Sequence, residues 1–505
     1  ANKVWGYVPD RGERIVAPTI PSEVITPNNP PTGWGILGDI YSRGWQRTDN
    51  TNNFLSFFAT FAYSFKNRYV VNANVRNDAS NVFGQDINHR IDPTYSFGLS
   101  WRASEEAFFQ KHLKWITTLN FRGTFGIQGN ALTRESPELI LSQQGVQPGY
   151  NRYFSTIGQI PNPYLSWERT RNWNFGVDLE LFRMFYMNLE YYTRRSNAVI
   201  TVDLPFEYGI DDMKRNGGII YNRGIEYTLS FTPIQKRDFS LNINLNASKN
   251  WNKGGETKID RNTAMYLRGG STQILKEGYP LSAFWSYSFA GLDGSNGKPM
   301  FNYVEVPDEE KSKSIDPTTY LVYSGETEPY FTGGLGFSFR YKSLSLNTSF
   351  SLLLGSKKRL PSPYSDFQGS GSMMPDPTKN VNRDLLNRWQ KPGDEVYTNI
   401  PGLPTWPIEI GWTLPNTDSA ESAIEMWEKS DAMVVSGSFL RCRNIGLSWQ
   451  MKKEWCDKIH AKNLAINFNM DNIFVIASKR FNGFDPELEN SIMPRSFSLG
   501  LNIGF

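Results

Sequence analysis

The sequence predicts an all-β fold, a transmembrane antiparallel β-barrel, from three observations. Long segments alternate apolar and polar residues with a period of two, and they reach the ~9–11 residues that a tilted strand needs to cross a membrane. The 505 residues include 42 Gly, 33 Phe, 24 Tyr and 15 Trp, which favours strands and turns over helices. No uninterrupted apolar run reaches the ~18 residues of a spanning helix.

The alternation is most regular in two segments. Residues 239–248 (FSLNINLNAS) place an apolar residue at every odd position and Ser or Asn at every even one, and residues 496–505 (SFSLGLNIGF) alternate without an error. A soluble β-sandwich also alternates, but its strands are shorter and its turn signals recur every ~8–12 residues. Polar positions rich in Asn, Ser and Arg, with aromatic residues near the strand ends, favour a barrel with a wet interior.

Thirteen segments are long enough to span a membrane. They are residues 54–65, 68–79, 93–102, 115–127, 171–182, 185–194, 219–231, 239–250, 330–341, 344–355, 436–451, 463–472 and 496–505. Bacterial barrels place short turns in the periplasm and long loops outside the cell. The short connections are 66–67, 103–114, 183–184, 232–238, 342–343 and 452–462. The long ones, expected to be extracellular, are 80–92, 128–170, 195–218, 251–329, 356–435 and 473–495.

The order of these connections decides where the remaining segments lie. Residues 281–290 look like a strand, but a spanning strand there would break the alternation of short and long connections, so we place them in the extracellular layer. Residues 1–53 form an extracellular loop segment, and residues 54–505 form the barrel strands with their loops. An odd set of strands does not make a conventional closed bacterial barrel. We therefore expect 54–65 and 496–505 to pair with strands from another polypeptide or an upstream part of this one, and not with each other.

The composition argues against several other classes of protein. Lys and Arg total 53 against 50 Asp and Glu, a net charge of +3, which is too balanced for a nucleic-acid-binding surface. His89 is expected outside the cell and His112 and His460 in periplasmic turns, so the three histidines do not converge on a catalytic site. No CxxC or HExxH spacing occurs. We expect no enzymatic activity, no metal site and no cofactor.

Two further features have structural interpretations. Cys442 falls inside an expected strand and Cys456 in the turn beyond it, which puts them too far apart for a disulfide. Residues 293–297 (DGSNG) lack the ligand spacing of a calcium-binding loop and are interpreted as a Gly-rich turn.

The long loop 356–435 carries the candidate ligand-facing residues, which are Trp389, Tyr397, Trp406 and Trp412. Aromatic rings on loops can stack on sugar rings, while nearby amides and carboxylates bond the hydroxyl groups. The alternative is that these rings pack the loop against its neighbours or against a lid protein. The sequence leaves both interpretations open.

Eight motifs occur in an order that resembles one family. They are residues 63–80 (YSFKNRYVVNANVRNDAS), 96–106 (SFGLSWRASEE), 119–130 (LNFRGTFGIQGN), 161–178 (PNPYLSWERTRNWNFGVD), 222–226 (NRGIE), 291–299 (GLDGSNGKP), 387–393 (NRWQKPG) and 438–447 (SFLRCRNIGL). Together they resemble the SusC/RagA family of TonB-dependent outer-membrane transporters, over nearly the whole chain from about Asn53 onward. Cys442 stands where the family commonly has an aliphatic residue, which suits a lipid-facing position.

The resemblance implies the C-terminal part of a barrel of about 22 strands that is filled by an N-terminal plug. About nine strands, the plug and the TonB-contacting segment would then lie outside this sequence. It implies an importer of oligosaccharides or peptides in the cell outer membrane, with a SusD-like surface lipoprotein as lid and energy delivered through TonB. The chain's ending resembles the signal read by the barrel-assembly machinery, which is a further expected partner along with outer-membrane lipid. The residues of this signal are Phe497, Leu499, Leu501, Ile503 and Phe505.

Two other functions stay open. A non-transporting outer-membrane barrel that acts as a structural partner in an envelope complex would have the same strand pattern, and the loop sequences do not discriminate. A soluble β-rich binding protein is the third hypothesis, which purification without detergent would support.

Overall fold

The computed structural model describes most of the chain. It covers residues 2–7, 45–50, 53–80, 91–130, 138–147, 152–204, 206–210, 212–256, 266–270, 275–302, 317–364, 380–403, 410–413, 420–488 and 491–505.

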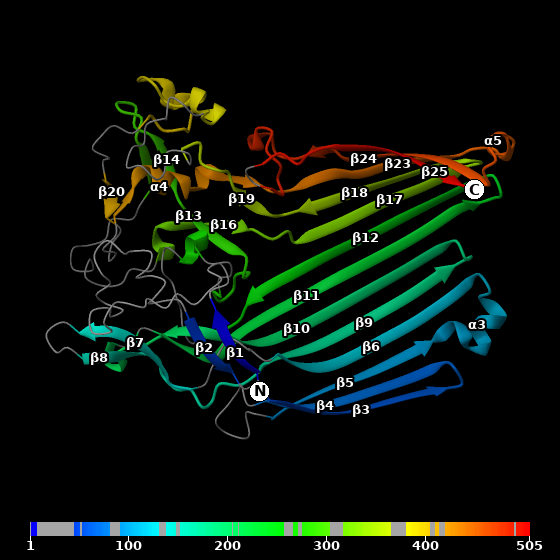
Figure 1. The fold of residues 1–505 in the computed structure, drawn as a ribbon, viewed down its shortest axis with the longest axis horizontal. Helices are drawn as coiled ribbons and strands as arrows, with labels where there is room; N and C mark the ends of the chain where they lie inside the picture. The colour runs from blue at the N-terminus through cyan, green and yellow to red at the C-terminus, as the bar shows by residue number, and fades with distance from the viewer. Residues whose placement is uncertain are drawn as a thin grey trace, which may run out of the picture.

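One antiparallel sheet of thirteen strands dominates the structure, in the order β25-β24-β23-β18-β17-β12-β11-β10-β9-β6-β5-β4-β3. Its strands are β3 (Phe54–Phe65), β4 (Tyr69–Ser80), β5 (Ile91–Arg102), β6 (Ile116–Asn130), β9 (Glu168–Leu181), β10 (Phe185–Asp203), β11 (Asp212–Gln235), β12 (Phe239–Gly254), β17 (Phe331–Tyr341), β18 (Leu344–Leu354), β23 (Phe439–Gln450), β24 (Asn463–Ile476) and β25 (Ser496–Gly504). They run side by side as a curved wall, from β3 at one rim to β25 at the other (Figure 1). All thirteen strands expected from the alternation are confirmed.

The two outermost strands are the open edges of this wall. β3 pairs only with β4 and β25 only with β24 within the described sheet, so β3 and β25 do not pair with each other. The expectation that 54–65 and 496–505 leave the wall open between them is confirmed. No helix in the described ranges is both long enough and apolar enough to cross a membrane.

The largest departure from the expected strands concerns the segment 195–218, which was expected to be a loop. β10 continues to Asp203 and β11 begins at Asp212, so most of this segment belongs to the sheet. The register shifts between Ala198 and Val199. Ala198 pairs with Gly218 and Val199 pairs with Asn216, so Gly217 is an extra residue in β11, and the residues of β11 on either side of it change faces.

The hairpin tips at one end of the sheet are tight turns. Lys66 and Asn67 have φ angles of 51° and 55°, and Phe182 and Arg183 have φ angles of 52° and 57°. Positive φ at both central residues is typical of the type I′ turn, whose twist matches that of the flanking strands. The second turn, expected at 183–184, lies one residue earlier, because the amide of Met184 donates to the carbonyl oxygen of Leu181.

Two of the connections at the same end are longer than the tight turns and contain small helices. Residues 103–115 contain η2 (Ala103–Glu105) and α3 (Ala107–His112), and residues 451–462 contain α5 (Lys453–Lys458). We call this end of the sheet, with connections 66–68, 103–115, 182–184, 236–238, 342–343 and 451–462, the turn end. It lies opposite the long loops, as Figure 1 shows at α3, α5 and the chain's C-terminus.

The long connections at the other end form a layer of small sheets, which we call the loop layer. The paired strands are β1 (Asn2–Tyr7) with β2 (Trp45–Asn50), β7 (Ile140–Gln147) with β8 (Arg152–Gln159), β13 (Ala283–Tyr287) with β16 (Leu321–Glu326), β14 (Phe289–Leu292) with β15 (Pro299–Phe301), β19 (Lys357–Arg359) with β22 (Val434–Ser436) and β20 (Ile410–Thr413) with β21 (Ala420–Ser422). The short helices are η3 (Phe206–Tyr208), η4 (Tyr266–Gly270), η6 (Pro317–Thr319), η8 (Arg383–Asn387), η9 (Asp394–Val396), α4 (Ala423–Glu428), η10 (Asp431–Met433) and η11 (Lys479–Phe481). The expectation that 281–290 stays outside the spanning set is confirmed by β13, which pairs only with β16.

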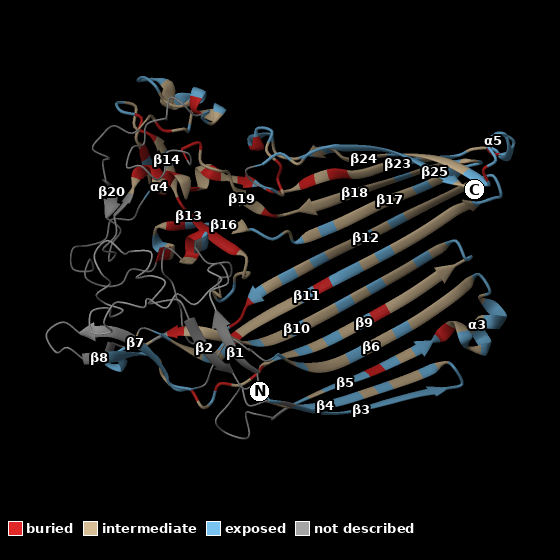
Figure 2. Cartoon of the chain, in the orientation of Figure 1, coloured by how far each residue is buried: buried red, intermediate tan, exposed pale blue. Residues whose placement is uncertain are grey.

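Two clusters of buried side chains hold the loop layer together. The first contains Leu267, Ala283, Trp285, Tyr287, Leu321 and Met426. The second contains Tyr364, Leu385, Ile424, Trp427 and Met433. Figure 2 shows the buried residues gathered mainly here, whereas the long strands carry alternating half-buried and exposed positions. The loop layer is therefore the part of the described chain that is built like a globular domain.

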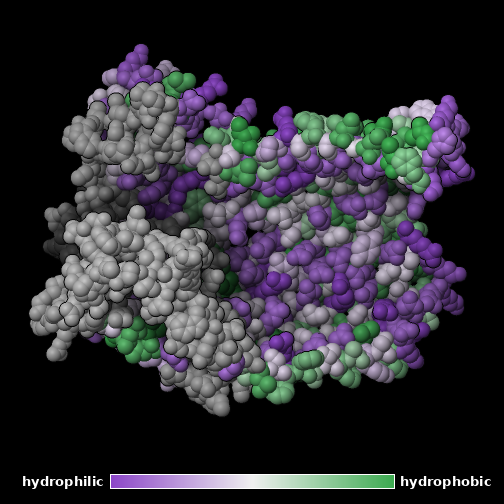
Figure 3. Space-filling view, viewed as in Figure 1, coloured by the Kyte–Doolittle hydropathy of each residue, from purple (hydrophilic) through white to green (hydrophobic). Residues whose placement is uncertain are grey.

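The two faces of the wall differ in polarity. On β12, Ile243 lies opposite Phe231 of β11 and Phe337 of β17, whereas its neighbour Asn244 lies opposite Ser230 and Gly336. Figure 3 looks into the hollow of the curved sheet, where hydrophilic residues cover most of the wall and hydrophobic ones lie toward the two rims. The wall therefore has an apolar outer face and a polar inner face.

Candidate functional site

The inner face carries a charged hydrogen-bond network on β6, β9 and β10, in the half of β9 and β10 nearer the turn end. One Nη2 atom of Arg122 lies 3.2 Å from Oδ1 of Asp178 and 2.8 Å from Oε1 of Glu190. The side-chain amides of Asn120 and Asn188 donate to Asp178 over 3.0 and 2.7 Å. Charge-assisted hydrogen bonds of this kind are stronger than neutral ones and fix the orientation of the ionised side chains on the sheet. Two carboxylates share one guanidinium, so the network presents a negative surface to the hollow.

Glycine makes room for this network. A Cβ atom at Gly176 would lie 3.1 Å from Nη2 of Arg122, which is closer than side chains ordinarily pack. The glycine therefore lets the arginine lie across β9 to reach Glu190 on β10.

A groove of about 720 Å³ opens on the same face near the loop layer. Hydroxyl, amide and charged side chains lie beside apolar ones in its lining, which comprises Ser56, Asn74, Arg76, Asp78, Thr94, Tyr95, Ser96, Thr124, Phe125, Gly126, Ile127, Gln128, Gly129, Trp167 and Asn172. One row of the ladder crosses it, from Asn74 through Ser96 and Gly126 to Asn172. The Oδ1 atom of Asn172 is buried and accepts no hydrogen bond in the described structure. The groove thus offers neutral donors and acceptors to a polar solute.

One ion pair closes the outer end of the groove. Nε of Arg76 lies 2.7 Å from both carboxylate oxygens of Asp78, and the Ser56 hydroxyl donates to the same carboxylate over 2.5 Å. Because the two charges neutralise each other, the groove as a whole has no net charge.

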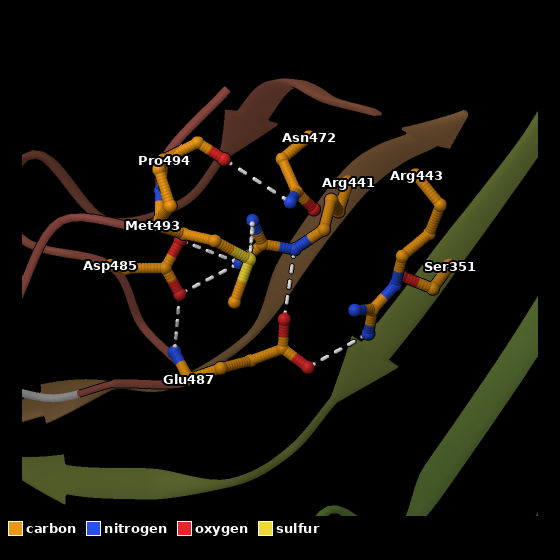
Figure 4. Close-up of polar contacts among 8 residues, drawn as sticks. All are labelled: Ser351, Arg441, Arg443, Asn472, Asp485, Glu487, Met493 and Pro494. Atoms are coloured by element: carbon orange, nitrogen blue, oxygen red, sulfur yellow. Dashed lines mark hydrogen bonds and ion pairs between the residues drawn. The ribbon is translucent and has the colours of Figure 1, made fainter. Parts of the chain in front are cut away.

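A buried cluster ties the last long connection to the inner face of β23 (Figure 4). Arg441, with 1% of its surface exposed, donates through Nη2 to both oxygens of Asp485 at 2.7 Å, and Asp485 is only 4% exposed. Its Nη1 donates to the sulfur of Met493 over 3.2 Å. Nε of Arg441 lies 2.8 Å from Oε2 of Glu487, an ion pair whose angle falls outside hydrogen-bond geometry. Arg443 holds the other oxygen of Glu487 over 2.8 Å.

This cluster fixes the described part of the connection, residues 477–488 and 491–495, against the wall. The amide of Glu487 also donates to Asp485, and the amide of Asp485 donates to the carbonyl oxygen of Ser491. Two arginines of one strand thus fix two carboxylates that are two residues apart in the loop. The loop therefore forms a fixed part of the inner surface near the mouth.

The loop layer contains several shifted titratable groups. Burial raises the pKa of the Glu428 carboxyl on α4 and that of the Tyr364 hydroxyl. Burial, with the nearby charge of Arg268, lowers the pKa of Arg359 to about 10. Arg359 donates to the carbonyl oxygens of Arg268 and Trp285, and its guanidinium lies 5.0 Å from the centroid of the Phe284 ring. These groups act as internal ties of the layer.

The four aromatic candidates of the long loop are only partly within the described residues. Trp389 is half-buried, its Nε1 donates to Glu395 over 3.1 Å, and its ring covers Gly297 and Gly402 so closely that a side chain at Gly297 would overlap it. Tyr397 has 89% of its surface exposed. Trp412 lies in β20, and Trp406 lies outside the described residues. The packing interpretation fits Trp389, whereas Tyr397 is open to a ligand or a lid.

The Gly-rich turn expected at 293–297 is a hydrogen-bonded turn beneath Trp389. Asp293 accepts bonds from the amide and hydroxyl of Ser295 and from the side chain of Asn296, and these bonds lower its pKa. Within the described ranges, no group of three or more His, Cys, Asp or Glu side chains is placed to hold a metal ion.

The histidines and cysteines lie apart from the groove. His112 ends α3 and His460 follows α5 in another connection of the turn end, while His89 lies outside the described residues. Both cysteines are free, as expected. Cys442 lies on the apolar face of β23, between Phe350 and Phe474 on the neighbouring strands, but none of its surface is exposed. The expected lipid-facing position is wrong in this respect, because the two rings approach each other to 6.5 Å beside the small side chain.

The residues of the expected assembly signal share the apolar face of β25. Phe497, Leu499, Leu501, Ile503 and Phe505 are 42–76% exposed. The first four lie opposite Met470, Phe468, Ile466 and Leu464 of β24.

The charged network, the groove and the Arg441 cluster were not among the sites that the sequence predicts. Arg122 and Arg441 stand on polar positions of expected strands, a pattern that could have marked them. Their partners could not be found in this way, because Glu190 and Asp485 are 68 and 44 residues away along the chain.

Known proteins share both the sequence pattern and the fold of this chain. Residues 18–352 match the family model described as TonB dependent receptor-like, beta-barrel. TonB-dependent receptor P3 of Formosa agariphila is 23% identical over 90% of this chain and 46% of its own length. TonB-dependent receptor SusC of Bacteroides thetaiotaomicron is 25% identical over 90% of this chain and 44% of its own length.

The structure of the RagAB peptide transporter has a similar fold. It superimposes with a TM-score of 0.69 at 23% identity, over 90% of this chain and 48% of that chain. The present chain therefore spans about half the length of the curated relatives it matches.

Proposed function

This chain belongs to the family of TonB-dependent receptor-like β-barrels, and from that premise we propose that it forms the C-terminal wall of an importer for oligosaccharides or peptides. The relatives also confirm the resemblance to SusC and RagA proteins and a location in the outer membrane. In the proposed arrangement the turn end faces the periplasm and the loop layer faces the outside of the cell. Upstream strands complete the barrel and a plug within it receives energy through TonB.

The observation that carries this proposal is the contrast between the two faces of the wall. An apolar outer face suits lipid, and the neutral, hydroxyl- and amide-rich groove on the inner face suits an uncharged polar solute that moves along the wall. Sugar hydroxyls and peptide amides can both form hydrogen bonds with these hydroxyl and amide side chains, so the proposal includes both substrate classes. The similar solved structure is that of a peptide transporter, and SusC is the name of another relative.

We further propose a SusD-like surface lipoprotein as the lid over the loop layer. The similar solved transporter carries the compound name RagAB, which supports the idea of a paired partner. Among the large hydrophobic residues of the described loop layer, Tyr397 is the most exposed, at 89%, and its ring is open to a lid or ligand. The barrel that contains this chain, tagged and purified from membranes in mild detergent, should carry a surface lipoprotein in stoichiometric amount. Tyr397→Ala should weaken that recovery if the ring lies at the lid contact.

Uptake measurements test the transport proposal. Gln128→Leu removes an exposed amide from the groove, whereas Trp173→Leu changes a residue on the outer face. We expect the first change to lower energised uptake of labelled oligosaccharide or peptide roughly two- to tenfold, the value of one hydrogen bond, and the second to leave uptake near normal. If neither solute enters under energised conditions while the lipoprotein is still recovered, the protein is the structural partner of an envelope complex instead.

We also propose that the barrel-assembly machinery reads the last strand. Phe497, Leu499, Leu501, Ile503 and Phe505 form an unbroken apolar row on an open edge, which supports recognition by strand addition. Phe505→Ser should then slow assembly of the barrel in cells while a barrel that has assembled stays stable. Unchanged assembly kinetics would exclude Phe505 from the signal.

A further inference from the structure

The turn end is far more basic than the rest of the chain. Its six connections hold twelve Lys and Arg residues against five Asp and Glu. This amounts to a net charge of +7, whereas the whole chain carries +3. The loop layer and the wall together therefore carry −4. The basic residues, which we call the basic collar, are Lys66, Arg68, Lys111, Lys114, Arg183, Lys236, Arg237, Lys342, Lys452, Lys453, Lys458 and Lys462.

The cationic groups of the collar form almost no ion pairs with carboxylates of the six connections. All of its residues except Arg68 are exposed. Arg68 lies 3.1 Å from Glu106, and it is the one member of the collar within ion-pair distance of a carboxylate in the six connections, all of which are described. The Nζ atom of Lys462 donates to the backbone oxygen of Phe505 over 2.8 Å. The collar therefore presents about ten free cationic groups to its surroundings.

Aromatic rings lie beside these cations at the level where the strands end. Lys66 lies 5.2 Å from the ring centroid of Phe65 and Lys342 lies 5.3 Å from that of Tyr341. Both rings are about half exposed, at 47% and 49%. Aromatic rings at strand ends mark the boundary between hydrocarbon and head groups in outer-membrane barrels. The cations that contact these rings are therefore held at the depth of lipid head groups.

The same arrangement recurs where two connections meet. The rings of Trp115 and Phe182 stack with centroids 5.7 Å apart, and the amide of Phe182 donates to the carbonyl oxygen of Trp115. Lys114 precedes the first ring and Arg183 follows the second, and all four residues are exposed. A merely solvated charged surface would not expose large rings beside Lys66, Lys342, Lys114 and Arg183, because apolar rings are disfavoured in water.

We propose that the basic collar binds the phosphate groups of anionic phospholipids in the membrane leaflet at the turn end, which is the periplasmic leaflet. Each ring anchors in the head-group boundary, and the adjacent Lys or Arg reaches a lipid phosphate. An anionic surface attracts a nearby Lys or Arg strongly enough to raise its occupancy about fivefold. The proposal depends on the orientation of the barrel and not on whether it transports a solute.

Lipid retention by the complete barrel that contains this chain tests the proposal. The barrel is purified in non-ionic detergent, exchanged into mixed phosphatidylglycerol and phosphatidylethanolamine, and its retained lipids are identified by native mass spectrometry. Phosphatidylglycerol should be enriched over phosphatidylethanolamine, and higher salt should lower the enrichment. Lys114→Gln with Arg183→Gln should reduce the enrichment by roughly fivefold or more. The matched control is Arg383→Gln with Lys391→Gln, which removes two exposed cations from the loop layer and should leave the enrichment unchanged.

Several results would overturn the inference. Equal retention of the two lipids would do so, as would an equal loss in the turn-end and loop-layer variants. Displacement of phosphatidylglycerol by inorganic phosphate alone would make the collar a general anion site and not a lipid contact. The unfolding temperature of each variant in detergent shows whether it has folded. If the double variant has unfolded, Lys453→Gln with Lys458→Gln, on the separate connection 451–462, must lower the enrichment or the proposal fails.

Discussion

The balance of buried charge around Arg441 decides how the last long connection is held. A guanidinium with 1% exposure beside a carboxylate with 4% exposure is stable only because each satisfies the other. The neighbouring Arg443 makes a similar contact to Glu487, but 40% of its side chain is exposed and water competes for its charge. Two arginines two residues apart thus have different energetic roles.

We predict that Arg441→Ala destabilises the attachment of residues 477–488 to the wall by about 3–5 kcal/mol, because it leaves Asp485 buried without a cation. Hydrogen exchange of the amides in this connection measures the free energy of opening. Arg443→Gln is the control, and we expect a change of no more than about 1 kcal/mol. Similar exchange rates in both variants would contradict the assigned burial.

Glu428 makes the loop layer sensitive to pH. Burial raises the pKa of this carboxyl, so folding favours its neutral form. Its contribution to stability is therefore fully present below the ordinary pKa of about 4.3 and is lost as pH rises through the raised value. The hydroxyl of Ser362 donates to Oε1 of Glu428 over 2.6 Å, a bond that an amide oxygen can also accept.

Glu428→Gln should accordingly protect α4 and β13 better than the wild type at about pH 8, with the difference shrinking toward about pH 4. Hydrogen exchange at several pH values provides the measurement. Glu454→Gln, at an exposed position of α5, is the control and should leave these amides unchanged. A wild-type loop layer that becomes more protected as pH rises would show that the sign is wrong.

At the scale of the strand, alternation predicts both the element and its faces. β3 has the bounds that alternation predicts, and β12, β17, β18 and β25 begin or end within a residue or two of them at most ends. Alternation fails where a strand contains an extra residue, as at the bulge at Gly217 in β11. The interruption is local, because the ladder with β10 resumes beyond the bulge.

We predict that Ile243→Arg destabilises the barrel by roughly 2–4 kcal/mol, because Ile243 lies among Phe231 and Phe337 on the face that meets lipid. Asn244→Arg should have a much smaller effect, since Asn244 is exposed on the inner face beside Ser230 and Gly336. Unfolding of the complete barrel in lipid with urea compares the two. Equal losses would contradict the assignment of the faces.

At the scale of the whole molecule, the open edges are the dominant feature. β3 and β25 each leave one row of backbone amides and carbonyls without a partner in the described sheet. Hydrocarbon does not solvate such groups, and an open sheet does not persist in a bilayer. The wall therefore needs further strands between its two rims.

We predict that this chain, produced alone and refolded in detergent, gives no heat-modifiable band on electrophoresis, whereas co-production with the rest of the barrel restores it. The physical reason is the cost of two unpaired edges. As a direct check, Thr60→Cys and Gly500→Cys should not form a disulfide, and the two native cysteines are buried and do not compete. Efficient cross-linking of this pair would mean that β3 and β25 close the wall themselves.

The sequence by itself determined the fold class, the thirteen strands, the separation of turns from long loops, and the absence of pairing between the two edge strands. These features follow from the alternation of side chains between the two faces of a strand, which is visible within each segment of the sequence. Only the tertiary structure decided the Arg122 network, the groove around Asn172, the Arg441 cluster and the burial of Cys442. Each depends on which strand lies beside which and in what register, and on partners far away along the chain, such as Glu190, 68 residues from Arg122, and Ser351, 92 residues from Arg443. The alternation within one strand does not identify the residues that lie opposite it on another strand. Those pairs are therefore known only from the three-dimensional arrangement of the strands.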